Sequence, residues 1–278
     1  MKVIKTINEM RKLTIEMSGT VGFIPTMGYL HHGHLSLVRL AKKKNDHVVV
    51  SIFVNPKQFQ PNEDFASYPR DTEKDLQLLQ DANIDAVFLP NVSEMYPENF
   101  ATYITIESLS KKLEGKSRPG HFQGVATIVA KLFNIIQPQQ AYFGQKDAQQ
   151  VVIMKKMVSD LQFPVEIVVG PTIREQDGLA MSSRNVYLSE KERKEATILF
   201  QSLKLAEELI RKGERNPVSV KKEMNDFIKK SVGVVDYISL ADPDTLDEVE
   251  NIKKNTLVSL AVFFGKTRLI DNIVVHSV

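Results

Sequence analysis

The sequence predicts an α/β fold, an open parallel sheet followed by a smaller α+β domain. Short apolar, β-branched runs alternate with amphipathic segments up to Gly170-Pro171. That alternation is typical of parallel strands joined by right-handed helical crossovers. After this point helices come first and three strands follow. We therefore expect two domains, at 1–170 and 171–278, which agrees with a length of 278 residues and about 150 residues per domain.

The elements of the first domain are assigned from apolar periodicity and from stop and turn residues. Strands are expected at 21–24, 47–54, 86–89, 103–106, 141–143 and 165–169. Helices are expected at 1–18, 70–82, 125–136 and 148–160, and in the amphipathic segment that starts near His31. Two loops, at 55–69 and 114–124, separate these elements. Long loops at strand carboxyl ends are more often functional than filler.

The second domain has clear helix-start signals. Asp177-Gly178 indicates a turn, and Ser189 with Glu192 has the spacing of a capping box that opens a long helix ending near Gly213. Asn216-Pro217 predicts another helix start, because Asn caps helices and Pro suits the first helical position. Strands are expected at 234–239, 256–264 and 269–275.

Composition limits the class of protein. The chain is 42% apolar and 25% charged, and its net charge of +2 is too small to hold nucleic acid or an anionic membrane by bulk attraction. Because cysteine is absent, disulfides and thiolate metal sites are excluded. The N-terminal residues lack the apolar core of a signal peptide, and no apolar run reaches the ~20 residues that cross a bilayer. We expect a cytoplasmic protein.

The stretch 21–40 carries the strongest functional signal. A buried strand, a turn at Gly28 and a helix start are predicted there. Ligands of open α/β sheets bind at strand carboxyl ends, and helix N-termini attract phosphate. Gly28 permits backbone angles closed to other residues, and Gly33 leaves no side chain between the backbone and a ligand. His31 and His34 share one face of the predicted helix. The segment therefore predicts a nucleotide phosphate site.

Two other interpretations of these histidines stay open. His31 and His34 could cap the helix and serve structure only. They could also be two ligands of a metal, although no third ligand follows at a matching spacing. Their place directly after a strand favours the phosphate site.

Lys146 and Asp147 follow the strand at 141–143 and precede a helix, so they are expected at the same sheet edge as His34. An ammonium group there can neutralise charge that builds on a phosphoryl group in a transition state. Asp147 could orient Lys146 or bind a ribose hydroxyl. A solvated Lys–Asp pair at a helix start is the alternative.

Ser182, Ser183 and Arg184 offer two hydroxyls and a planar cation, which suit phosphate oxygens. The same residues fit an ordinary capped turn. Since they lie beyond the domain boundary, they are also placed to form a flap that closes on a ligand held by the first domain.

Five further polar residues have both a functional and a structural interpretation. Gln58 and Gln150 can donate to a carboxylate or hydroxyl, or can be surface residues. Arg118 and His121 lie on the basic loop at 114–124, which alternatively only faces solvent. Asp75 lies on a helix among other charges, and one carboxylate does not make a magnesium site.

Five motifs together resemble the pantoate–β-alanine ligase family. They are Pro25-Thr26-Met27-Gly28 with His31-His32-Gly33-His34, Asn55-Pro56 with Gln58-Phe59, Arg118-Pro119-Gly120-His121-Phe122, Gly144-Gln145-Lys146-Asp147 with Gln149-Gln150, and Ser182-Ser183-Arg184-Asn185. The His-x-Gly-His element is shared with other nucleotidyltransferases, whereas the five in this order are specific and span nearly the whole chain. His32 and Gln145 depart from the family's usual residues, at positions that carry no chemistry in it.

The resemblance implies a Rossmann-like nucleotidyltransferase domain that binds ATP and pantoate, a C-terminal α+β lid domain and a two-step reaction. ATP and (R)-pantoate would form pantoyl adenylate and pyrophosphate, and β-alanine would then displace AMP to give pantothenate. Mg²⁺ is expected to be carried by ATP phosphates, with its protein ligands unknown. The likeness also suggests a homodimer.

The resemblance further assigns roles to residues of this chain. The catalytic residues would be His34, as proton donor, with His31, Lys146, Ser182, Ser183 and Arg184. The ATP site would comprise Met27, Gly28, Tyr29, Leu30, His31, His32, Gly33, His34, Gly144, Gln145, Lys146, Asp147, Ile173, Met181, Ser182, Ser183 and Arg184. Pantoate and β-alanine would bind Gln58, Gln150, Asn55, Arg118 and His121.

Two other functions compete with the ligase. A different nucleotidyltransferase of the same fold would leave Gln58, Gln150 and the Arg118 loop without a role. A nucleotide-binding module without catalysis would bind ATP only. An RNA-charging enzyme is not expected, because no basic region is available to hold RNA. The ligase hypothesis requires His34 and Lys146 to meet over the α-phosphorus of one nucleotide.

Overall fold

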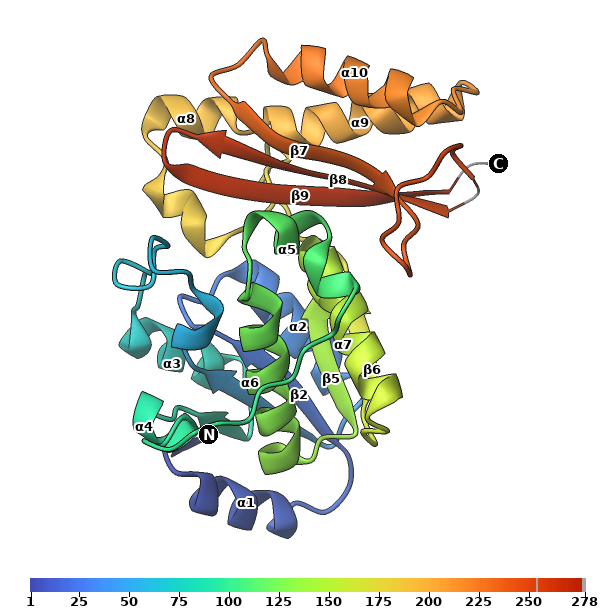
Figure 1. Cartoon of the computed structure of the whole chain (residues 1–278). Helices are drawn as coiled ribbons and strands as arrows, with labels where there is room; N and C mark the ends of the chain where they lie inside the picture. The colour runs from blue at the N-terminus through green and yellow to red at the C-terminus, as the bar shows by residue number, and fades with distance from the viewer. Residues whose placement is uncertain (254, 277–278) are drawn as a thin grey trace. The chain divides into compact units, whose positions relative to one another are not determined.

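A computed structural model describes residues 1–253 and 255–276 of the chain, and Figure 1 shows its elements. The chain forms two compact units. The first comprises Met1–Gly144 and Ile153–Pro171, and the second comprises Gln145–Val152 and the residues from Thr172 onward. The short segment Gln145–Val152 therefore belongs with the second unit, although it directly follows a strand of the first.

The first unit is built on a six-stranded parallel sheet of order β1-β4-β3-β2-β5-β6. Its strands are β1 (Lys2–Ile4), β2 (Val21–Thr26), β3 (His47–Ile52), β4 (Ala86–Phe88), β5 (Gln140–Gly144) and β6 (Glu166–Gly170). Because β2 lies between β3 and β5, its carboxyl end is central in the sheet. The predicted α/β class with a parallel sheet is confirmed.

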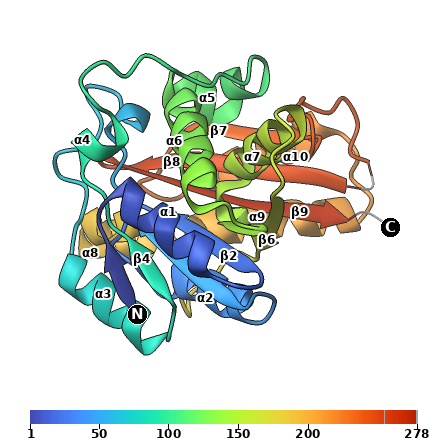
Figure 2. The ribbon, with the colours of Figure 1, turned by 90° about the horizontal axis from the view of Figure 1, so that it is seen from below.

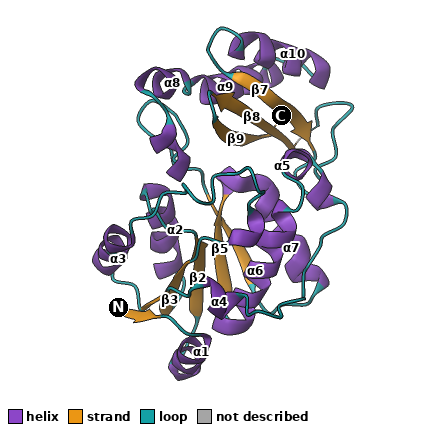
Figure 3. Ribbon diagram, turned by 60° about the vertical axis from the view of Figure 1, so that its left-hand side comes forward, coloured by secondary structure: helices purple, strands orange, loops and turns teal. Residues whose placement is uncertain are grey.

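Helices cover both faces of this sheet. They are α1 (Ile7–Glu16), α2 (His32–Lys42), α3 (Thr72–Asp81), α4 (Val92–Met95), α5 (Leu113–Ser117), α6 (His121–Ile136) and α7 (Ala148–Asp160), of which α7 joins this unit from Ile153 onward. Helices α2 and α3 lie on one face and α6 on the other (Figure 3). Helix α1 lies beside α6 (Figure 2). Ile24 and Val50 of the sheet pack with Leu37 of α2 and Leu79 of α3 in one buried cluster.

The second unit is a three-stranded antiparallel sheet of order β7-β8-β9, covered on one face by two helices. Its elements are α8 (Glu190–Glu195), α9 (Ile198–Arg211), α10 (Pro217–Ile228), β7 (Val234–Ala241), β8 (Asn255–Phe264) and β9 (Thr267–His276). Leu203 of α9 and Met224 of α10 pack against Leu260 of β8 in its core. The predicted capping box is present, since Ser189 Oγ accepts from the Glu192 N–H and both Ser189 donors reach the Glu192 carboxylate.

The start of the chain differs from its prediction. The segment 1–18 is not one helix: β1 pairs with β4 at the sheet edge, and α1 begins only after Thr6, whose side chain forms a capping box with Glu9. The strand at 21–24 runs on through Pro25 to Thr26. Thr26 O accepts from the Phe53 N–H on the β3 side, so the ring nitrogen of Pro25 faces the β5 side, where pairing has already ended at Phe23.

Three later predictions are also wrong. The segment 103–106 forms no strand, and instead the Ile104 N–H donates to Thr127 Oγ1 of α6. The loop at 114–124 is mostly helical, because α5 and the first turn of α6 occupy it around a left-handed Gly120. The long helix expected after Ser189 is interrupted between α8 and α9. In each case tertiary packing outweighs the local signal.

Candidate active site

The turn between β2 and α2 has the geometry that its glycine predicted. Gly28 has φ +82° and the next residue, Tyr29, has φ +52°. A Cβ added to Gly28 would lie 2.9 Å from Asp75 Oδ2 and 3.0 Å from Ile52 Cγ2. Both the backbone angle and the lack of space therefore require glycine here. The chain reverses sharply before His31, which places the histidines at the start of α2.

The side chain of Asp75, on α3, holds the backbone of this turn. Its Oδ2 accepts from the Tyr29 N–H at 2.8 Å and its Oδ1 from the Leu30 N–H at 2.6 Å. Asp75 is only 2% exposed, and this burial raises the pKa of its carboxyl, although the two N–H groups act in the opposite direction. This role of Asp75 is not predictable from the sequence, because nothing local distinguishes Asp75 from the other charges of its helix.

The two histidines hydrogen-bond to the backbone of the helix start. His31 is the N-cap of α2, and its Nδ1 accepts from the Gly33 N–H at 3.1 Å. The Nδ1 of His34 accepts from the His31 N–H at 3.3 Å, and the two rings lie 4.1 Å apart between centroids. A neutral imidazole whose Nδ1 accepts carries its proton on Nε2. Both rings thus have an Nε2–H donor at a helix N-terminus, which suits an anionic ligand.

A chain of amides connects the predicted pantoate site to this turn. Asn55, 1% exposed, donates to Gln58 Oε1 at 3.0 Å and to Gly124 O at 3.1 Å. Gln58 in turn donates to the sulfur of Met27 at 3.0 Å. The Tyr96 hydroxyl donates to Asn55 Oδ1 at 2.8 Å, and burial raises the pKa of Tyr96. Tyr96 lies outside all five motifs, so this contact has no signal in the sequence.

Arg118 and His121 contact the segment that carries Gln58. The Arg118 guanidinium makes a two-pronged pair with Glu63, at 2.7 and 2.6 Å. Burial acts to raise the pKa of Glu63, but the hydrogen bonds and charge of Arg118 outweigh it and lower that pKa. Arg118 also lies 3.2 Å from His121 Nε2, so the opposite nitrogen, Nδ1, donates to Gln58 O at 2.8 Å. Direct contact of Arg118 and His121 with a substrate stays a prediction.

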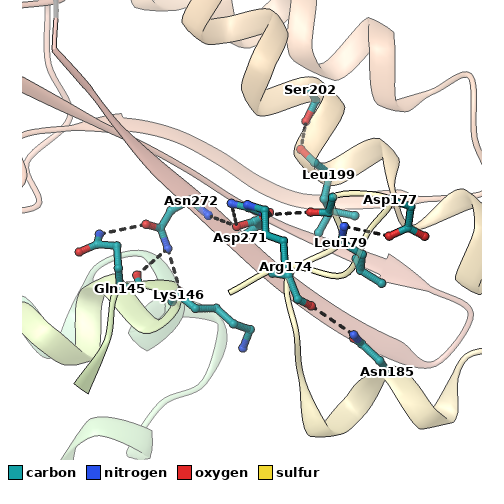
Figure 4. Close-up of polar contacts among 12 residues, drawn as sticks. Gln145, Lys146, Arg174, Asp177, Leu179, Asn185, Leu199, Ser202, Asp271 and Asn272 are labelled. Atoms are coloured by element: carbon teal, nitrogen blue, oxygen red, sulfur yellow. Dashed lines mark hydrogen bonds and ion pairs between the residues drawn. The ribbon is translucent and has the colours of Figure 1, made fainter. Parts of the chain in front are cut away.

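In the second unit, Lys146 lies on a short 3₁₀ turn, Gln145–Asp147, that leads into α7. Lys146 Nζ is 3.8 Å from Asp147 Oδ1. The side chain of Asn272, on β9, holds the backbone of this turn. Its amide nitrogen donates to Gln145 O at 3.0 Å and to Lys146 O at 2.8 Å (Figure 4). The other predicted residues of this segment, including Gln150, are in or next to the first turn of α7.

Ser182, Ser183 and Arg184 also belong to the second unit. Ser182 caps a 3₁₀ turn, Ser183–Tyr187, by accepting from the Arg184 N–H at 3.2 Å. The preceding chain folds back at Asp177-Gly178, so that the Met181 N–H donates to Ile173 O at 3.0 Å. These contacts are those of a capped turn, and ligand binding by the same residues stays a prediction.

The predicted site residues thus fall into two groups. The first unit holds Asn55, Gln58, Arg118, His121 and the turn 27–34, here named the histidine turn. The second unit holds the 3₁₀ turn Gln145–Asp147, named the lysine turn, and the turn 182–184, named the serine turn. The expected meeting of His34 and Lys146 remains a prediction. Within residues 1–253 and 255–276, no group of three or more His, Asp or Glu side chains could hold a metal ion. Across the same residues, no helix has the length and apolar character to span a membrane.

Comparison with known proteins identifies the family. The family model for pantoate-beta-alanine ligase matches residues 2–274. The chain belongs to the pantoate–β-alanine ligase family. The resemblance predicted from the five motifs is confirmed.

Several pantoate–β-alanine ligases are similar to the chain over its whole length. The pantothenate synthetase of Acetivibrio thermocellus is 55% identical over 280 residues, covering 99% of this chain and 100% of the relative. The crystal structure of pantothenate synthetase from Thermus thermophilus has a TM-score of 0.95 and 46% identity, covering 98% of this chain and 99% of that one. The pantoate-beta-alanine ligase from Francisella tularensis, complexed with β-γ ATP and β-alanine, has a TM-score of 0.81 and 34% identity, covering 98% and 97%.

Proposed function

We propose that the chain joins (R)-pantoate and β-alanine to form pantothenate, using ATP and releasing AMP and pyrophosphate through a pantoyl adenylate. The observation that carries this proposal is the family match over residues 2–274, with all five motifs present. The Francisella tularensis relative, solved with β-γ ATP and β-alanine, supports ATP and β-alanine as substrates here.

In the first step the pantoate carboxylate attacks the α-phosphorus of ATP and pyrophosphate leaves. Negative charge then develops on the phosphoryl oxygens. The Nε2–H groups of His31 and His34, the N-terminus of α2 and the Lys146 ammonium can stabilise that charge without a protein nucleophile. Gln58, held by Asn55, is placed in the same unit as the histidines and is assigned to pantoate. Mg²⁺ would enter as part of the ATP complex and screen the leaving pyrophosphate.

In the second step the amine of β-alanine attacks the acyl carbon of the adenylate, and AMP leaves. The mixed anhydride must be protected from water until the amine arrives. We assign this protection to closure of the second unit, which carries Ser182, Ser183 and Arg184. We also place the enzyme in the cytoplasm as a homodimer, on family likeness.

The proposal is tested by product analysis. Incubation with ATP, Mg²⁺, pantoate and β-alanine should release AMP and pyrophosphate in equal amounts. Exchange of labelled pyrophosphate into ATP should require pantoate but not β-alanine. Release of ADP, or exchange that is supported by a phosphorylated acceptor in place of pantoate, would contradict the ligase and favour another nucleotidyltransferase.

A further inference from the structure

Two polar residues interrupt the apolar sequence of β9. Asp271 and Asn272 lie between Ile270 and Ile273, and they are only 2% and 4% exposed. Buried polar groups are retained when they have specific partners, because an unpaired one costs free energy. Successive residues of a strand point to opposite faces, so the two side chains can serve different partners.

Asn272 is fully engaged with the lysine turn. Its amide nitrogen donates to the carbonyls of both Gln145 and Lys146, while its Oδ1 accepts from the Gln145 side chain at 3.0 Å. The 3₁₀ turn leads into α7, and its first two carbonyls also face β9 (Figure 4). Asn272 bonds both of them, from a position 126 residues beyond Lys146 along the chain. The backbone position of Lys146 is thus set by β9.

Asp271 holds the chain that leads into the serine turn, and it does so through Arg174. Its carboxylate makes two bonds to the Arg174 guanidinium, at 2.6 and 3.0 Å (Figure 4). Arg174 also donates to Gly178 O at 3.1 Å and lies over the Phe200 ring at 4.0 Å. Arg174 therefore fixes the fold-back at 173–181, which leads directly into Ser182. Lys146, Ser182 and Asp271 line one small space beside this network, so both turns meet at β9.

We propose that Asp271 and Asn272 are positioning residues that fix Lys146 and the turn of Ser182 to Arg184 at one spacing. This inference rests on the proposed function, in which Lys146 stabilises charge on the phosphoryl oxygens and the unit that carries Ser182 to Arg184 protects the adenylate. Asn272 acts on Lys146 through its carbonyl, and Asp271 acts on Ser182 through Arg174. The second unit thus presents its cationic and hydroxyl groups as one preassembled set.

The sharpest test is Asn272→Asp. This change keeps the shape and the oxygen that accepts from Gln145, but it replaces the amide donor by an oxygen that faces two carbonyls. We expect the single-turnover rate of pantoate-dependent pyrophosphate release to fall about 10- to 100-fold, because a misplacement of about 1 Å can cost that much. The ATP dissociation constant, measured by calorimetry, should change less than about threefold, since only the placement of one side chain is altered.

Amide hydrogen exchange tests the role of Asn272 and the role of Asp271 separately, and it does not depend on an activity measurement. Asn272→Asp should speed exchange in peptides covering 145–150 and leave those covering 182–187 as in wild type. Asp271→Asn, which weakens the bond to Arg174, should speed exchange at 182–187. Asn255→Asp is the matched control, because Asn255 lies exposed on the neighbouring strand, where its side chain bonds the ring of His276.

The outcomes are distinct. Wild-type rate and wild-type exchange at 145–150 in Asn272→Asp would overturn the positioning role. Equal losses in Asn272→Asp and Asn255→Asp would also overturn it, since they would indicate general loss of sheet stability. A wild-type protein that forms no adenylate contradicts the proposed function, whereas the exchange pattern still decides whether Asn272 and Asp271 hold the two turns.

Discussion

The histidine turn after β2 and the lysine turn after β5 are each held by a buried side chain from a distant element, but through opposite backbone groups. Asp75 accepts from two backbone N–H groups of the histidine turn, whereas Asn272 donates to two carbonyls of the lysine turn. Both turns lead into helices, the first into α2 and the second, a 3₁₀ turn, into α7. The histidine turn is held by its N–H groups and the lysine turn by its carbonyls.

The charge of each support also differs. Asp75 is a carboxylate at the N-terminal side of α2, where the helix dipole favours negative charge. Asn272 is neutral, so it adds no charge that would offset that of the Lys146 ammonium. A buried side chain can therefore pair with the backbone groups of a turn without cancelling the charge of the residue that the turn presents. Asp75 can titrate and Asn272 cannot, so the support of the histidine turn should respond to pH and Asn272 should not.

The largest expected effect comes from removing the presented side chains themselves. His34→Ala and Lys146→Ala should each lower kcat by about 10²- to 10³-fold, as the loss of one transition-state donor does. ATP affinity should change far less, because these groups act on charge that develops later. Steady-state kinetics with calorimetry measures both, and Lys156→Ala on the exposed face of α7 is the control. A loss confined to ATP affinity would show that the two turns only bind the ground state.

Asp75→Asn tests the support of the histidine turn. An amide has only one acceptor oxygen, so one N–H of Tyr29 or Leu30 loses its partner. The free energy of unfolding should fall by about 1–3 kcal/mol, and we expect kcat to fall about tenfold through displacement of the histidines. Urea unfolding and steady-state kinetics measure these. Asp81→Asn, an exposed change on the same helix, should have neither effect. If the two variants behave alike, Asp75 is not a support.

The pH dependence sharpens the contrast between the turns. Burial raises the pKa of Asp75 in the folded protein above its ordinary 3.8, so the folded state binds this proton more tightly than the unfolded state. The stability that this pKa shift contributes is therefore fully present below pH 3.8. It is lost as the pH rises through the pKa that Asp75 has in the folded protein. Stability curves of wild type and Asp75→Asn should diverge in that window, as urea unfolding at a series of pH values would show.

The neutral support of the lysine turn provides the control for this pH series. Because the side chain of Asn272 does not titrate, Asn272→Ala should lie below wild type by a constant free energy of unfolding over the same pH window. Parallel curves for wild type and Asp75→Asn would contradict the assignment of the pH-sensitive group to the histidine turn.

Tyr96→Phe should have the smallest effect, because it touches neither turn. It removes one buried hydrogen bond to Asn55, which costs about 1 kcal/mol of stability. Since Asn55 holds Gln58, the KM for pantoate should rise a few-fold while the KM for ATP stays constant. Substrate titrations distinguish these, with Tyr103→Phe as an exposed control. An equal rise in both constants would mean that the amide chain supports the whole site rather than the pantoate side.

Much of the fold could be predicted from local sequence. The buried runs of β2, β3 and β5 and the helix α7 follow from apolar periodicity, and Gly28 indicated a turn that only glycine can make. The errors fall where local signals are weak or conflicting. β1 is three residues long and exists through its pairing with β4. The segment 114–124 resembled a loop because Gly and Pro are frequent there, yet within it only Gly120 among the glycines takes a left-handed angle.

The family, the parallel sheet and the residue types that can act on a phosphate are predictable from the chain alone, because strand and turn signals and five spaced motifs are local properties. The side chains that hold those residues in place become known only from the folded structure. Asp75, Tyr96, Asp271 and Asn272 carry no local signature of their partners, which lie 41 to 127 residues away along the chain. Hydrogen bonds of this kind form only after the chain has folded, so no pattern of neighbouring residues specifies them.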